Sequence, residues 1–193
     1  MNALKVFTTR AEMVREMIPR HGIGCEIGVY AGEFAQSLIN ITNPQKLFLI
    51  DAWDLVIHEI PCSDEHGNNM VTLPSPFLYK TTVNRFSTDS RVKIIKGWSS
   101  TEIPARPSSL DWVYVDANHS YEGCLNDLKL IEPKMNKNSF IMGHDYEINT
   151  EKCRYMWNFG VGKAVDDFCK DHGWELIAKA MDGCVSYCLQ RKG

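Results

Sequence analysis

Two hydrophobic patterns alternate along almost the whole chain, and this alternation most limits the folds that the sequence can adopt. Short apolar runs typical of buried strands occupy residues 23–30, 46–53, 91–97, 110–117 and 138–146. Segments whose apolar residues recur at helical spacing occupy residues 32–41, 77–87, 120–133 and 162–173. Strands separated by crossover helices are typical of a parallel α/β sheet.

The two ends of the chain complete the expected fold. Residues 3–19 are predicted as one or two leading helices, and residues 174–190 as a closing hairpin with its turn at 181–183. We therefore expect a doubly wound, Rossmann-like α/β fold: a seven-stranded, mostly parallel sheet with a C-terminal antiparallel hairpin. The length of 193 residues suits one domain, over residues 1–193, and is too short for two ordinary ones.

Residues 52–76 do not fit this scheme, because a strand and the next helix are usually joined by a loop of a few residues. A long connection at the carboxyl end of a strand is commonly a lid or a substrate loop. The alternative is a disordered insertion. We expect a lid or substrate loop in this segment.

Charge and hydropathy narrow the partners and the location. The net charge of −3 provides no basic footprint for nucleic acid or an anionic membrane. We find neither a signal peptide nor an apolar run long enough to span a bilayer. The seven cysteines are scattered without a C-x-x-C pair, which indicates reduced thiols. We expect a cytoplasmic protein with a small-molecule partner, no nucleic acid and no membrane, and a homo-oligomer is left open.

The first predicted strand ends on a turn suited to close contact with a ligand. In "CEIGVYAGEFA", Glu26 lies within the strand, Gly28 at its end and Gly32 where the next helix begins. Glycines let the backbone turn sharply and approach a ligand. Dinucleotide enzymes place G-x-G-x-x-G here, and this chain lacks that spacing. An acid two positions before the turn glycine would repel a pyrophosphate but suits a cationic ligand.

The second and third predicted strands also end on groups that can contact a ligand. Asp51 closes the second strand, about 20 residues after the glycine turn, where Rossmann-like folds place an acid that binds ribose hydroxyls. Asp54 lies beyond the expected strand edge and is the poorer choice. The third strand ends on Gly97, Trp98 and Ser99. Trp98 either stacks on a ligand ring or caps the core.

The fourth and fifth strands end on carboxylates that should converge. Asp116 follows "LDWVYV" and Asp145 follows "SFIMGH". Two such acids would repel and raise one another's pKa, and a bound divalent cation such as Mg²⁺ would compensate this repulsion. His119, three residues after Asp116, is placed to take a proton from a substrate hydroxyl. The alternative is that Asp116 and Ser120 cap the next helix and His119 lies on the surface, which leaves Asp145 unexplained.

Two motifs resemble those of a known enzyme family. E-x-G-x-x-x-G at residues 26–32 resembles the first motif of class I S-adenosylmethionine-dependent methyltransferases, with Tyr30 where a glycine is common. "VDANHSYEGCLNDL" followed by "GHDY" resembles the group that includes macrocin O-methyltransferase and related sugar or polyketide O-methyltransferases. In that group D-x-x-H-x-Y follows strand four and H-D follows strand five. The resemblance runs from Glu26 to the closing hairpin.

The resemblance implies a cofactor, a metal and roles for individual residues. The residues implied to bind S-adenosylmethionine are Glu26, Gly28, Tyr30, Gly32, Asp51, Gly97, Trp98, Ser99 and Asp116. It also implies Mg²⁺ on Asp116 and Asp145, with His119 as the catalytic base and Asp116 as a second catalytic group. His144 stands where metal-dependent relatives often supply a further carboxylate or amide, so it is either a third metal ligand or an acid–base group.

The implied function is transfer of the methyl group of S-adenosylmethionine to a hydroxyl of a sugar-like or natural-product small molecule, with Mg²⁺ assisting. Three alternatives stay open. They are a metal-independent methyltransferase in which Asp116 and His119 act directly on the acceptor, a non-catalytic S-adenosylmethionine-binding protein, and a dehydrogenase. The sequence does not identify the acceptor, because specificity in such folds lies in variable loops.

Overall fold

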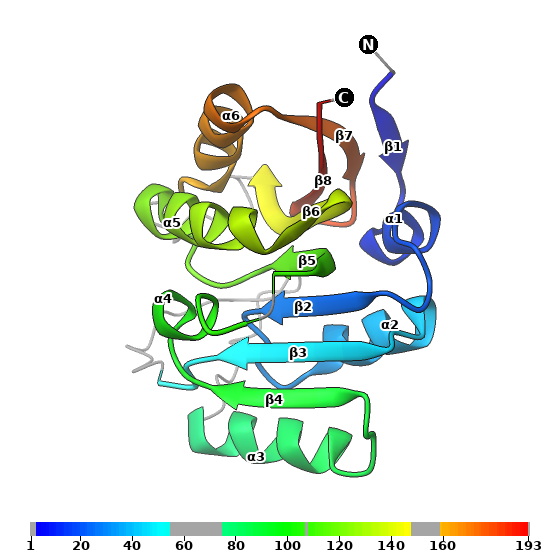
Figure 1. Cartoon of the computed structure of the whole chain (residues 1–193), viewed down its shortest axis with the longest axis vertical. Helices are drawn as coiled ribbons and strands as arrows, with labels where there is room; N and C mark the ends of the chain where they lie inside the picture. Colours follow the sequence, from blue (N-terminus) through cyan, green and yellow to red (C-terminus); the bar gives the residue numbers. More distant parts are fainter. Residues whose placement is uncertain (1–2, 55–74, 107, 148–158, 193) are drawn as a thin grey trace, which may run out of the picture.

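The protein is described by a computed structural model that covers residues 3–54, 75–106, 108–147 and 159–192. One sheet runs through the molecule in the order β1-β7-β8-β6-β5-β2-β3-β4 (Figure 1). Its strands are β1 (Lys5–Phe7), β2 (Ile23–Ile27), β3 (Lys46–Asp51), β4 (Val92–Lys96), β5 (Leu110–Val115), β6 (Met135–Glu147), β7 (Trp174–Ala180) and β8 (Val185–Arg191). The helices are α1 (Arg10–Met17), α2 (Glu33–Thr42), α3 (Ser75–Phe86), α4 (Ser99–Glu102), α5 (Tyr121–Ile131), the 3₁₀ turn η1 (Glu132–Lys134) and α6 (Val161–His172).

The sheet is mostly parallel and closes with an antiparallel hairpin, as expected. Strand β8 runs antiparallel to both of its neighbours, β6 and β7, while the other neighbouring strands pair in parallel. The hairpin turn lies between Ala180 and Val185, and Gly183 there has a φ of +98°. The Rossmann-like fold class is therefore confirmed.

The sheet has one strand more than the seven predicted, because part of the leading segment is not helical. Residues 5–7 form β1, which pairs in parallel with β7 and places Val6 opposite Lys179. Extended backbone at this position covers the edge of β7 that the hairpin leaves unpaired. Helix α1 begins only after Thr9, whose side chain accepts a hydrogen bond from the N–H of Glu12.

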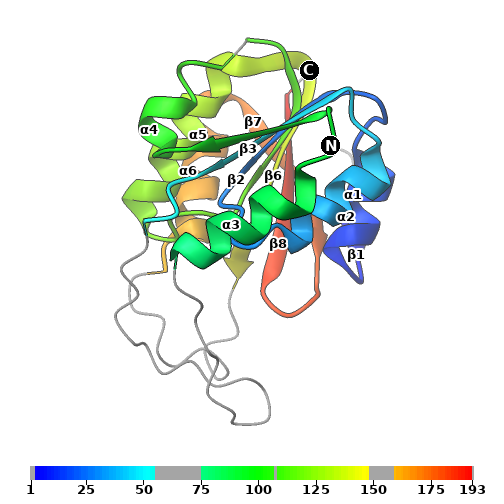
Figure 2. The same ribbon diagram turned by 90° about the horizontal axis from the view of Figure 1, so that it is seen from below.

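Helices cover both faces of the sheet. Figure 2 shows α1, α2 and α3 on one face and α4, α5 and α6 on the other. Leu38 and Leu78 belong to the core on the first face, and Leu128 and Phe168 to the core on the second. The helices predicted at 32–41, 77–87, 120–133 and 162–173 correspond to α2, α3, α5 with η1, and α6. The short helix α4 was not predicted.

The order of the strands reverses at one point of the sheet, and ligands bind at such a point in folds of this kind. The chain runs from β2 outward through β3 and β4, and then returns to the other side of β2 as β5. Connections therefore leave the carboxyl ends of β2 and β5 in opposite directions, which is the switch point of a doubly wound sheet. The site is expected at this edge.

Some predictions concern residues that the structure does not describe. Most of the segment 52–76, expected to be a lid or substrate loop, lies outside the described residues, as do Cys62 and Cys153. Among the described cysteines, Cys25, Cys124 and Cys188 are buried thiols outside any disulfide. Within the described ranges, no helix has the length and apolar character needed to cross a membrane.

Candidate functional site

A cleft of about 880 Å³ opens at the carboxyl ends of the central strands. This volume lies within the range of about 300–1,000 Å³ common for small-molecule sites. The predicted residues that line it are Glu26, Gly28, Tyr30, Asp51, Gly97, Trp98, Ser99, Asp116 and His119. Side chains from four separate strand ends therefore meet in one cleft, at the switch point of the sheet.

The two glycines of the first motif, Gly28 and Gly32, have different surroundings. Gly28 has a φ of +84°, and a Cβ added to it would lie 1.9 Å from the backbone oxygen of Asp116. The ends of β2 and β5 can approach this closely only if residue 28 has no side chain. Gly32 has a φ of +80° at the start of α2, and its added Cβ would lie 2.8 Å from the ring of Phe86. Gly32 is not among the residues that line the cleft, and its assignment to the cofactor stays a prediction.

Asp51 braces the glycine turn from the neighbouring strand. One oxygen of its carboxylate accepts hydrogen bonds from the N–H groups of Val29 and Tyr30, at 2.8 and 3.0 Å, and the other accepts one from Trp53 at 2.7 Å. Tyr30 has a φ of +54°, and its carbonyl accepts hydrogen bonds from the Trp53 indole and the Thr82 hydroxyl. These contacts explain how a tyrosine keeps a conformation that favours glycine. Ribose binding by Asp51 stays a prediction.

Glu26 presents a buried carboxyl group to the cleft. Its side chain is 2% exposed, and within the described residues its Oε2 atom has no hydrogen-bond partner. Burial, followed by the nearby charge of Asp116, raises the pKa of Glu26 well above its usual range, although Arg10 acts in the opposite direction. A buried acceptor without a partner is costly unless a ligand supplies the donor. The site therefore favours a ligand that carries a cationic donor, such as an ammonium group.

Trp98 and Ser99 line the cleft just after the end of β4. Trp98 is 59% exposed and lines the cleft, so the alternative that it caps the core is wrong. The hydroxyl of Ser99 donates to Oδ1 of Asp127 at 2.6 Å. Asp127 lines the cleft too and was missed by the sequence analysis. The signal was present in the sequence, because Asp127 stands at an apolar position of α5, in line with Cys124 and Ile131.

Asp127 should make the stability of the protein depend on pH. Burial raises its pKa to about 6, although the Ser99 hydrogen bond acts to lower it. The folded state then binds this proton more tightly than the unfolded state, so the free energy of unfolding should fall as the pH rises from 4 to 6. In the Asp127→Asn variant, the free energy of unfolding should fall less over this pH range than in the wild type, by on the order of 2 kcal/mol. Thermal or urea unfolding at each pH measures this difference. Asp171→Asn, which removes an exposed acid of α6, is the control, and equal pH profiles for both variants would contradict the prediction.

His119 bridges the two predicted carboxylates. Its Nε2 atom lies 3.3 Å from Oδ1 of Asp116 and 3.3 Å from Oδ2 of Asp145. The imidazole packs against the ring of Phe159, with 4.8 Å between the centroids. Burial acts to lower the pKa of His119, but the hydrogen bond to Asp116 and the charges of both carboxylates raise it. A proton taken up by this imidazole is therefore stabilised.

The loop that carries His119 is also held by a helix cap. The hydroxyl of Ser120 accepts a hydrogen bond from the N–H of Gly123 at 3.1 Å, and Asn118 accepts one from the N–H of Ser120 at 3.0 Å. Capping by Ser120 thus coexists with the contacts of His119. The prediction of a His119 that merely lies on the surface does not fit these contacts.

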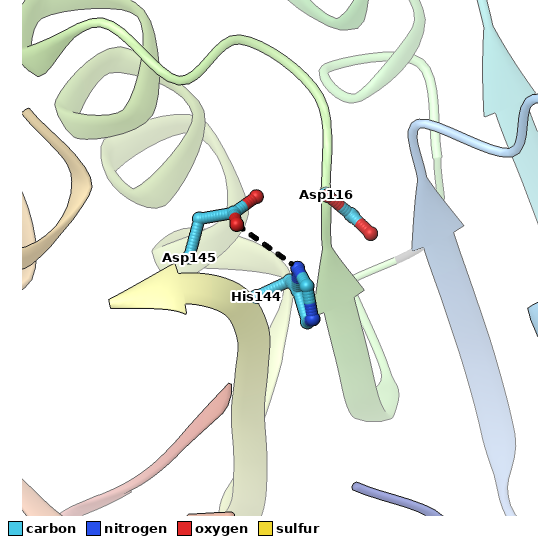
Figure 3. A group of neighbouring side chains, drawn as sticks. All are labelled: Asp116, His144 and Asp145. Atoms are coloured by element: carbon cyan, nitrogen blue, oxygen red, sulfur yellow. Dashed lines mark ion pairs between the residues drawn. The ribbon is translucent and has the colours of Figure 1, made fainter. Parts of the chain in front are cut away.

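Asp116, His144 and Asp145 form a compact group beside the cleft. Each offers one ligand atom, and these atoms all lie within 4.8 Å of one another. Figure 3 shows the three side chains at the ends of β5 and β6, with the ion pair of His144 and Asp145 dashed. Burial acts to raise the pKa of Asp145, but the hydrogen bond and charge of His144, together with His119, hold it below its usual value. Asp116 belongs to both the cleft and this group, whereas His144 and Asp145 do not line the cleft.

Residues 25–146, more than half of the chain, match the model of a protein family described as a methyltransferase domain. No curated protein matches the sequence. The matched segment begins before the glycine turn and ends just beyond Asp145, so it contains every predicted site residue.

Solved structures resemble the chain in fold. The S-adenosylhomocysteine-bound methyltransferase PaMTH1 of Podospora anserina is 17% identical, covers 95% of this chain and 76% of its own, and has a TM-score of 0.63. The N-methyltransferase NodS of Bradyrhizobium japonicum is 12% identical over 95% of each chain, with a TM-score of 0.66. The fibrillarin pre-rRNA processing protein of Methanococcus jannaschii is 12% identical, covers 92% of this chain and 69% of its own, and has a TM-score of 0.62. At these identities the likeness concerns the fold alone.

Proposed function

The chain belongs to the methyltransferase-domain family and is an S-adenosylmethionine-dependent methyltransferase, and we propose that it methylates a hydroxyl oxygen of a small molecule. The observation that carries this proposal is the position of His119, which lines the cleft and contacts two carboxylates at 3.3 Å. Such an imidazole is suited to remove the proton of a hydroxyl. The motifs around Asp116 and Asp145 resemble those of the macrocin O-methyltransferase group, and on this basis we also propose that the chain belongs to that group.

The cleft suits S-adenosylmethionine. The buried Oε2 of Glu26 needs a donor, and the amino-acid end of the cofactor carries an ammonium group. Gly28 lines the cleft, and its lack of a side chain lets the ends of β2 and β5 come together there. Asp51 would bind the ribose, and the turn of Trp98 and Ser99 would hold the adenine ring. When bound, the cofactor supplies an electrophilic methyl group.

The residues of the site would align and deprotonate the acceptor. The Nε2 atom of His119 faces both carboxylates and would carry the proton shared with them, so His119 would take the hydroxyl proton on Nδ1. Asp116 and Asp145 would stabilise the resulting imidazolium. The packing of Phe159 on the imidazole holds its plane. Alignment of the hydroxyl oxygen with the methyl group is the main contribution expected from the protein.

A small-molecule acceptor is favoured over RNA. The net charge is −3, and the cleft is lined by Asp51, Asp116 and Asp127, whose carboxylates would repel a phosphate backbone. Proteins of similar fold include an N-methyltransferase and a pre-rRNA processing protein, so the fold does not choose the acceptor. The proposal of a hydroxyl acceptor therefore rests on the site chemistry. Cytoplasmic location stays a prediction.

Methyl transfer from isotope-labelled S-adenosylmethionine into a panel of sugars, phenols, polyketides, amines and RNA tests the proposal. We expect label in a hydroxyl-bearing compound, together with calorimetric binding of S-adenosylhomocysteine. Label found only in amines or RNA would contradict the hydroxyl acceptor. Binding of the cofactor without transfer to any acceptor would favour the alternative of a non-catalytic binding protein.

We also propose that Asp116, His144 and Asp145 hold a divalent cation. Two carboxylates and an imidazole offer three ligand atoms that all lie within 4.8 Å of one another. The carboxylates suit Mg²⁺, and the imidazole extends the choice to Mn²⁺. A cation here would lower the pKa of an acceptor hydroxyl. The competing arrangement is a metal-independent site, in which His119 alone bridges the two carboxylates.

Chelation separates these two arrangements. With a metal-assisted site, dialysis against EDTA should lower the methyl-transfer rate at least roughly tenfold, since a metal supplies several kcal/mol of stabilisation. Addition of Mg²⁺ or Mn²⁺ should restore the rate in the wild type but not in Asp145→Asn. If turnover is undiminished in a strong chelator, the metal proposal is wrong and the metal-independent mechanism is favoured.

A further inference from the structure

An arginine from the N-terminal segment reaches the cleft. Arg10, the first residue of α1, lines it together with Glu26 and Phe34. The guanidinium lies over the Phe34 ring, 4.2 Å from the centroid, and its Nη1 atom lies 3.8 Å from Oδ2 of Asp116. That second distance exceeds the length of a hydrogen bond, so Asp116 does not engage the guanidinium in a bidentate pair.

The fold fixes the position of Arg10. Helix α1 lies beside β7, as Figure 1 shows. The backbone N–H of Arg10 donates to Oδ2 of Asp182 at 2.8 Å, in the turn between β7 and β8. Thr9 caps the same helix end. The closing hairpin therefore holds the start of α1 at the mouth of the cleft.

The charges around Arg10 match a zwitterion. An arginine guanidinium stays protonated in proteins, so Arg10 brings a fixed positive charge to the cleft. The buried Oε2 atom of Glu26 has no partner among the described residues, and Glu26 lines the same cleft as Arg10. An amino acid carries an ammonium and a carboxylate on one carbon. Glu26 and Arg10 are complementary to these two groups.

We propose that Arg10 is a positioning residue that binds the α-carboxylate of the amino-acid end of S-adenosylmethionine, while Glu26 binds the α-ammonium. This assignment rests on the proposed function of the cleft. It gives the N-terminal segment a part in cofactor binding, whereas the sequence indicated only leading helices there. The competing explanation is that Arg10 neutralises Asp116 and does not touch the cofactor.

Calorimetry with three ligands distinguishes these explanations. The ligands are S-adenosylhomocysteine, its decarboxylated analogue, and 5′-methylthioadenosine, which lacks the amino-acid end. Arg10→Met keeps an apolar stem against Phe34 and removes the charge. We expect this variant to bind S-adenosylhomocysteine roughly 10- to 100-fold more weakly, the usual effect of losing a charged hydrogen bond. Its affinity for the other two ligands should match that of the wild type.

Arg15→Met is the matched control, because it removes an exposed arginine of the same helix. It should leave the affinities for all three ligands unchanged. If Arg10→Met weakens all three ligands equally, or weakens none, Arg10 does not bind the carboxylate. If the wild type binds neither S-adenosylhomocysteine nor 5′-methylthioadenosine, the proposed function fails and the role of Arg10 fails with it.

Discussion

Replacing His119 by glutamine should lower the methyl-transfer rate by about 10²- to 10⁴-fold, the usual contribution of a positioned general base. Glutamine retains a donor for Asp116 and Asp145 but cannot accept the hydroxyl proton. The affinity for S-adenosylhomocysteine should change only slightly, because Glu26 and Arg10, not His119, are assigned to the cofactor. Single-turnover kinetics with labelled cofactor, together with calorimetry, measure the two quantities separately.

The control for this variant is another histidine that is paired with a carboxylate. His172 lies with Nδ1 2.6 Å from Oε2 of Glu132, and Glu132 also accepts hydrogen bonds from Trp174 and Arg191. Because His172 is not among the residues that line the cleft, His172→Gln should lower the melting temperature without slowing transfer. If both variants slow transfer equally, the effect of His119 is structural. If His119→Gln leaves the rate unchanged, His119 is not the base.

The sequence predicted the parts of the fold that depend on local patterns. Buried runs ending on a polar residue identify the carboxyl end of a strand, which is how Asp51, Asp116 and Asp145 were found. Strand β1 could not be predicted in this way, because three residues become a strand only by pairing with β7, far away in the sequence. Arg10 was missed for the same reason, since its position depends on Asp182.

The motif of the first strand also shows where a local pattern is ambiguous. Gly28 and Gly32 both have positive φ, and both were assigned to the cofactor from the resemblance. Only Gly28 lines the cleft, while Gly32 makes room for Phe86. Tyr30, which departs from the usual motif, does line the cleft and keeps its conformation through its carbonyl contacts. The spacing of glycines predicts a turn, but tertiary packing decides which of them line the cleft.

Replacing Gly28 by alanine should damage both stability and cofactor binding. The new Cβ would lie 1.9 Å from the backbone oxygen of Asp116, so the ends of β2 and β5 would have to separate. Overpacking and the positive φ together should reduce the free energy of unfolding by roughly 2–5 kcal/mol. Because Glu26 and Asp116 flank the contact, the affinity for S-adenosylhomocysteine should fall as well. Urea unfolding and calorimetry measure the two effects.

Gly173→Ala isolates the conformational part of this effect. Gly173 ends α6 with a φ of +70°, but a Cβ added there meets nothing within 4 Å. This variant should therefore lose only about 1–2 kcal/mol, the usual penalty for a left-handed residue that is not glycine. Its affinity for S-adenosylhomocysteine should not change. A Gly28→Ala variant that behaves like Gly173→Ala in both measurements would show that the close approach of β2 to Asp116 is not needed for cofactor binding.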